Sequence, residues 1–87
     1  MVNQQKSITM EHFEISVTHN NQNYHFEVRD YMHHDDDKCK YEVYSNGDFI
    51  GSFEPDNHKI LHICKNPGLV DEALLHLVAD QLEKDHI

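Results

Sequence analysis

The sequence predicts an α+β fold, a five-stranded antiparallel meander sheet with one C-terminal helix packed on one face. Apolar and polar side chains alternate in successive short stretches between residues 11 and 64, and this alternation is typical of strands with one buried face. The segments between these stretches contain Asn, Gly, Asp and Pro, the residues that form tight turns. Near residue 70 the apolar spacing changes to that of an amphipathic helix.

The first two strands are expected over residues 11–29, on either side of an Asn-rich turn. Their inward side chains are Phe13, Ile15, Val17, Tyr24, Phe26 and Val28. Asn favours the turn because it tolerates a left-handed backbone. We place the loop at residues 21–22, which puts Glu14 opposite Arg29 in a favourable pairing of charges.

The third and fourth strands are expected to flank the pair Asn46-Gly47, a strong hairpin signal. A two-residue turn would send Phe49 and Phe53 to the outer face of the sheet. A three-residue turn, with Gly47 in a left-handed bulge position, brings both rings inward. Because a one-residue slip moves every side chain to the other face, the buried face should decide the register. We therefore expect the bulged hairpin, with Tyr41 and Phe49 buried on the helix side.

The fifth strand is expected at residues 59–64, with Leu61 and Ile63 inward. A helix should follow, with Asn66 as its cap and Pro67 at its first position, where the missing N–H of Pro costs nothing. The side chains at helical spacing that should face the sheet are Val70, Leu74, Leu77, Val78, Gln81 and Leu82. Leu75 lies on the margin of this stripe.

Length and cysteine content bound the class of protein. The chain has 87 residues, enough for one domain. We expect a flexible N-terminal tail at residues 1–9 and a single α+β domain at residues 10–87. Two cysteines are too few for a disulfide scaffold, and residues 1–10 contain no apolar stretch of a signal peptide. These observations predict a cytoplasmic protein with two reduced thiols.

The charge of the chain disfavours two classes of partner. Sixteen acidic residues stand against seven basic ones, which gives a formal net charge of −9. Nucleic acids and anionic membranes are bound mainly through Lys and Arg, and the basic residues here form no stripe. We therefore expect neither a nucleic-acid nor a membrane partner, and a protein partner or homodimer remains.

The loop between the second and third strands holds the densest group of possible metal ligands, including His33, His34 and Asp36. Neighbouring residues in an extended chain point to opposite sides, and no Gly in residues 33–38 permits a sharp turn toward one metal ion. The aspartates also lack the alternating spacing of a calcium loop. We interpret the segment as a solvated loop, with metal binding as the alternative.

A second group of possible ligands is expected on the outer face of the sheet: His12, His25, His62 and Cys64. In an open meander the first and fifth strands are separated by four spacings of about 4.8 Å, so that only closure of the sheet would assemble a site there. The chain contains nine histidines. A histidine-dependent metal-binding or pH-responsive domain is therefore the alternative function.

Catalytic motifs are missing from the sequence. It has no Gly-rich phosphate loop, no nucleophile elbow and no His-Glu-x-x-His pair. We therefore expect no enzyme activity and no cofactor.

The leading hypothesis is a small non-catalytic interaction module that self-associates through the outer face of the sheet. In the bulged register, apolar side chains face outward on the third to fifth strands, where polar ones are expected, and a contiguous cluster of this kind is typical of a protein contact. The candidate interface residues are Tyr44, Ile50, Ile60, His62 and Cys64.

Overall fold

A computed structural model of the chain describes residues 10–31 and 39–86. Its elements are β1 (Met10–His19), β2 (Gln22–Tyr31), β3 (Tyr41–Ser45), β4 (Asp48–Pro55), β5 (Leu61–Lys65) and α1 (Glu72–His86). All neighbouring strands are antiparallel and their order is β1-β2-β3-β4-β5. The predicted α+β fold, a five-stranded antiparallel meander with one C-terminal helix, is confirmed.

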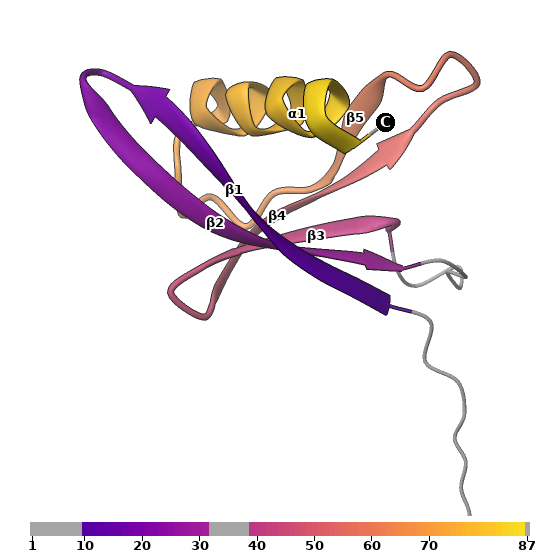
Figure 1. Cartoon of the computed structure of the whole chain (residues 1–87), viewed down its shortest axis with the longest axis horizontal. Helices are drawn as coiled ribbons and strands as arrows, with labels where there is room; N and C mark the ends of the chain where they lie inside the picture. Colours follow the sequence, from indigo (N-terminus) through magenta and orange to yellow (C-terminus); the bar gives the residue numbers. More distant parts are fainter. Residues whose placement is uncertain (1–9, 32–38, 87) are drawn as a thin grey trace, which may run out of the picture.

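The helix packs against β1 and β5, the two edge strands of the sheet (Figure 1). The helix thus lies close to both edges of the sheet at once. The sheet therefore bends around α1, and its concave face encloses the core. The buried apolar side chains in this core are Ile15, Val17, Phe26, Val28, Tyr41, Val43, Ile50, Phe53, Leu61, Leu74, Leu75, Val78, Ala79 and Leu82.

The β1–β2 hairpin turns through Asn20 and Asn21, whose φ angles are 54° and 62°. Two left-handed residues make the turn that matches the twist of paired strands. The loop thus lies one residue before the predicted position, and Glu14 faces Glu27 rather than Arg29. The predicted ion pair is wrong because Asn20, too, tolerates a positive φ.

The β3–β4 hairpin also has a two-residue turn, with φ angles of 51° at Asn46 and 87° at Gly47. Tyr44 pairs with Phe49, and the register then shifts, so that Val43 pairs with Gly51. The positive φ of Gly47 and the burial of Tyr41 are confirmed.

The predicted inward position of Phe49 is wrong. Its pairing with Tyr44 places its half-buried ring on the outer face of the sheet. The extra residue that we expected in the turn lies in β4 instead, at Ile50, which is buried with 2% of its surface exposed. This bulge restores the inward direction of Phe53, because one inserted residue reverses the alternation of a strand.

The helix begins at Glu72, five residues after the predicted start at Pro67. The side chain of Asn66 accepts a hydrogen bond from the backbone N–H of Gly68 at 2.9 Å, and Gly68 has a φ of 85°. This local turn uses the side chain that we expected to cap the helix. The carbonyl of Asp71 instead accepts the first helical bonds, from the backbone N–H groups of residues 74 and 75.

Leu75 lies at the centre of the helix–sheet contact rather than on its margin. Its side chain is fully buried, and a Cβ atom placed on Gly51 would lie 3.0 Å from its Cδ2 atom. Glycine at position 51 therefore lets the helix approach β4 closely. The helix is rotated about its axis relative to the predicted stripe, which leaves Leu77 only half-buried.

The two cysteines form a disulfide that joins Cys39, just before β3, to Cys64 in β5. The register shift between Ser52 and Phe53 leaves Cys64 as the extra residue opposite β4. The prediction of two reduced thiols is wrong, because the curvature of the sheet brings together two cysteines that are 25 positions apart.

Candidate functional site

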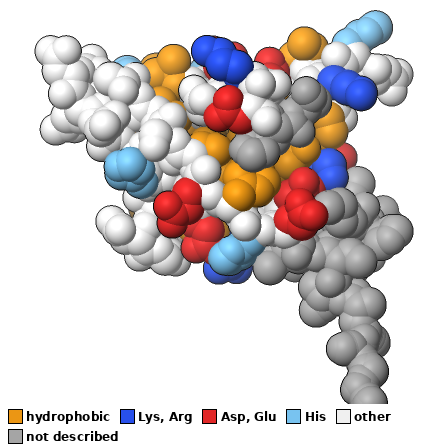
Figure 2. Space-filling model, in the orientation of Figure 1, with side chains coloured by type: hydrophobic (Ala, Val, Ile, Leu, Met, Phe, Trp, Pro, Cys, Tyr) orange, Lys and Arg blue, Asp and Glu red, His pale blue; other side chains and the backbone are white. Residues whose placement is uncertain are grey.

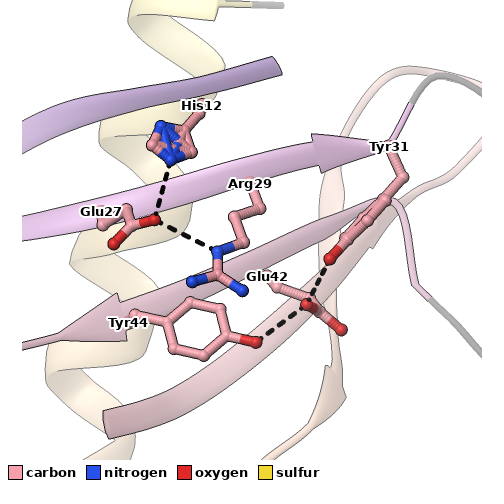
Figure 3. A network of polar contacts seen from close by, with 6 residues as sticks. All are labelled: His12, Glu27, Arg29, Tyr31, Glu42 and Tyr44. Atoms are coloured by element: carbon pink, nitrogen blue, oxygen red, sulfur yellow. Dashed lines mark hydrogen bonds and ion pairs between the residues drawn. The ribbon is translucent and has the colours of Figure 1, made fainter. Parts of the chain in front are cut away.

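The outer face of β1, β2 and β3 carries a continuous polar and aromatic network (Figure 3). Alternation along the strands places its members on one face, since every second side chain of a strand points the same way. The residues drawn in it are His12, Glu27, Arg29, Tyr31, Glu42 and Tyr44.

Arg29 is held in place from two directions. Its Nε atom donates to Oε2 of Glu27 at 3.1 Å, and its guanidinium carbon lies 4.1 Å from the centre of the Tyr44 ring. The hydrogen bond to Glu27 is the main cause that raises the pKa of Arg29 above its ordinary value. Nε2 of His12 lies 3.1 Å from the same Glu27 oxygen. The guanidinium group is therefore a fixed cation over an aromatic face.

Glu42 holds two tyrosines of neighbouring strands. The hydroxyl groups of Tyr31 and Tyr44 donate to its Oε1 atom at 2.9 and 3.0 Å. Burial, followed by these bonds to the carboxylate, raises the pKa of both tyrosines. Both rings therefore stay neutral near pH 7 and act as oriented donors.

Phe49 extends the network onto β4. Its ring meets that of Tyr44 edge to face, with centroids 5.6 Å apart, a favourable arrangement of two aromatic quadrupoles. Tyr44 is thus in contact with Arg29, Glu42 and Phe49. We name Arg29, Tyr31, Glu42, Tyr44 and Phe49 the outer-face platform.

Of the five predicted interface residues, the structure places only Tyr44 in this platform. The outward position predicted for Ile50 is wrong, because the bulge turns this side chain into the core. Ile60 is exposed, with 47% of its surface accessible, and precedes β5. Cys64 is bonded to Cys39, so its thiol is not available for a contact.

His62, in β5, contacts Asp56, which holds the β4–β5 turn. One carboxylate oxygen, Oδ1, accepts the backbone N–H groups of His58 and Ile60 at 2.8 and 3.0 Å. The other oxygen lies 2.8 Å from Nε2 of His62. The bond to His62 and then these backbone bonds lower the pKa of Asp56. The arrangement explains His62 as a residue that fixes the β4–β5 turn.

The predicted metal ligands divide into two groups. His33, His34 and Asp36 lie outside the described residues. Nδ1 of His25 lies 3.1 Å from the Ser16 hydroxyl, far along the sheet from His62. Among residues 10–31 and 39–86, no three His, Cys, Asp or Glu side chains are grouped as a metal ion would require.

Sequence reasoning missed Phe49 and the role of Arg29. The alternation of β2 placed Arg29 on the outer face, but the misplaced turn paired it with Glu14, and its contact with Tyr44 was not foreseen. Asn46-Gly47, taken as a strict two-residue turn, would have placed Phe49 beside Tyr44. The Asn46-Gly47 turn sequence was therefore the signal that could have placed Phe49 on the outer face.

Charge on the visible surface shows no basic stripe. On the face shown in Figure 2, the Lys and Arg side chains lie apart from one another. Within the described part of the chain, no helix is long and apolar enough to cross a membrane.

Comparisons with protein-family models, curated proteins and solved structures find no match for this chain.

Proposed function

We propose that this chain is a small non-catalytic interaction module that binds a protein partner on the outer-face platform. The observation that carries the proposal is the fixed stack of Arg29 on Tyr44, with Glu27 and Phe49 holding its two ends. Arg, Tyr and Phe are enriched at the centres of protein interfaces. Side chains that are already held in place lose little conformational entropy when a partner binds.

Charge favours a basic partner surface. Glu27 and Glu42 flank the single guanidinium group of the platform, and the whole chain carries a formal charge of −9. Such a field attracts Lys- and Arg-rich proteins and repels nucleic acids and anionic membranes. The partner we propose presents basic and aromatic side chains to the platform.

Three sequence-based proposals need to be considered again. Self-association through the outer face is not retained, because Ile50 is in the core and Cys64 is in a disulfide. The cytoplasmic location rested in part on reduced thiols, and disulfides are typical of oxidising compartments. The metal-binding or pH-responsive alternative gains no support from His25 and His62, which bond to Ser16 and Asp56.

Selection of displayed random peptides tests the proposal without a known partner. The wild-type chain should select peptides rich in Lys or Arg with an aromatic residue, and these should shift the NMR signals of Arg29, Tyr44 and Phe49. Tyr44→Ala should abolish their binding. The matched control is Leu69→Ala, at an exposed apolar residue with 62% of its surface accessible, before α1. Peptides that bind Tyr44→Ala as well as wild type would refute the platform.

A further inference from the structure

The edge of β1 offers a second surface, independent of the outer-face platform. β1 is the first strand in the sheet order and spans Met10–His19. Across residues 10–31 and 39–86, its only backbone pairing is with β2, and no loop or helix bonds to its other edge. A long edge strand with unpaired amides is a template for another strand.

The turn determines which amides point away from β2. His19 and Gln22 flank the two-residue turn, so they form a hydrogen-bonded pair, and such pairs alternate with non-bonded ones along an antiparallel ladder. The unbroken register then directs odd-numbered residues of β1 toward β2. The residues whose backbone N–H and C=O groups face the open edge are His12, Glu14, Ser16 and Thr18.

At the opposite edge of the sheet, a backbone donor is already bonded to the helix. The backbone N–H of Leu61 in β5 donates to Oε2 of Glu83 in α1 at 2.8 Å. The helix thus covers part of the β5 edge with a carboxylate acceptor. The difference points to β1 as the edge that receives a partner strand.

A second copy of β1 fits this edge in one register better than in any other. In two antiparallel registers, nearly the whole of β1 pairs with β1 of the second copy. In both, the outward-facing amides of one copy lie opposite those of the other. If the twofold axis passes through Glu14, two carboxylates lie directly opposite each other. If it passes through Ile15, Glu14 lies opposite Ser16. The same axis places Glu11 opposite His19, so no like charges lie directly opposite each other, and pairing of this kind stabilises adjacent strands.

We propose that the chain forms a homodimer in which residues 11–19 of β1 pair antiparallel with the same residues of a second copy, about an axis at Ile15. The backbone hydrogen bonds form at the pairs His12–Thr18 and Glu14–Ser16, each of which occurs twice. On the concave side, half-buried Phe13 lies opposite Val17 of the second copy, which continues the apolar layer across the axis. The sheets of the two copies then form one continuous sheet through their β1 strands.

Hydrogen exchange on the wild-type chain tests the pairing without any substitution. Amides that bond to β2 should be protected at every concentration. The amides of His12, Glu14, Ser16 and Thr18 should exchange quickly in dilute protein and at least about tenfold more slowly where sedimentation shows dimer. A chain that sediments as a monomer at millimolar concentration overturns the proposal. A dimer in which these four amides stay unprotected also overturns it.

Cross-linking tests the register. Opposed residues of a hydrogen-bonded pair have Cα atoms about 5.5 Å apart, a separation that a disulfide can bridge. Under mild oxidation, a mixture of the Glu14→Cys and Ser16→Cys chains should give a linked heterodimer. Glu14→Cys alone should link poorly. Efficient linking of Glu14→Cys to itself would place the axis at residue 14 and refute the proposed register.

A matched pair of substitutions tests the backbone contact. Ser16→Pro removes one outward-facing donor and no bond to β2, whereas Ser16→Ala keeps the donor, and both lose the hydroxyl that contacts His25. Ser16→Pro should weaken the dimer about thirtyfold relative to Ser16→Ala, the effect of one lost hydrogen bond in each subunit. Equal dimer affinity of the two folded variants overturns the proposal. If Ser16→Pro does not fold, the exchange pattern of the wild type decides. The proposal would also be overturned if the four amides became protected only when a strand of another protein binds, while the chain itself forms no dimer.

Discussion

The β1–β2 and β3–β4 hairpins both reverse direction through two left-handed residues, Asn20 with Asn21 and Asn46 with Gly47. Beyond the turn they differ. The first hairpin keeps one register over its full length, whereas the second shifts register at Ile50. In β4, the alternation that starts at the turn would point Phe53 to the outer face. The bulge at Ile50 reverses the alternation and returns Phe53 to the core. Local turn chemistry fixes where a strand starts, and burial then decides where its alternation must be broken.

The largest expected effect follows from the bulge. Ile50→Asp should unfold the domain, because it puts a carboxylate in the core, and even Ile50→Ala should lower the free energy of unfolding by about 2–4 kcal/mol. Phe49→Ala, at the adjacent half-buried position on the outer face, is the control and should cost less. Urea denaturation measures both. If Ile50→Asp folds normally, the bulge is not at this residue.

Close packing against the bulged strand gives the next effect. Gly51→Ala should destabilise the domain by about 1–3 kcal/mol, because the added methyl group would crowd Leu75. In the Gly51→Ala, Leu75→Ala double variant, the loss should be smaller than the sum of the two single losses. Thermal and urea unfolding measure this coupling. Strict additivity would mean that the helix does not approach β4 at this point.

The two turns should respond alike to a β-branched residue. Gly47→Val and Asn21→Val each place valine at a positive φ, and each should lower the free energy of unfolding by about 1–2 kcal/mol. Asn21→Gly is the control, since glycine adopts this conformation without strain. Urea denaturation compares the three variants. A tolerated valine in only one hairpin would show that the turns differ.

The smallest effect concerns alkaline pH. Burial, with a smaller contribution from Asp30, raises the pKa of Tyr41 in β3 above its ordinary value. The stability that depends on the neutral hydroxyl is therefore complete below about pH 10, where the unfolded tyrosine ionises, and is lost as pH rises through the folded pKa. Tyr41→Phe should reduce this alkaline loss. Thermal unfolding between pH 8 and 11 measures it, with Tyr24→Phe in the other hairpin as control. An unchanged pH dependence in Tyr41→Phe would contradict the assignment.

Sequence reasoning reached the strand order, the faces of β1 and β2 and the single helix, because these depend on patterns that repeat over many residues. It failed where one residue changes the outcome. The bulge at Ile50 depends on how β4 and α1 pack together, which no local pattern contains. The helix starts late because Asn66 bonds to Gly68 in a turn instead of capping the helix. The pairing of Cys39 with Cys64 depends on the bend of the whole sheet.

Packing of one helix on both the first and the last strand affects how the chain folds. The β1–β2 and β3–β4 hairpins join residues that are close in sequence, and such hairpins form within microseconds. α1 follows all five strands in the chain, yet its contacts with β1 span nearly the whole described sequence. Contacts of this separation form slowly, because a long loop must close before they stabilise anything. During synthesis, the apolar side of the meander therefore stays open to water, and to chaperones, until the helix has left the ribosome.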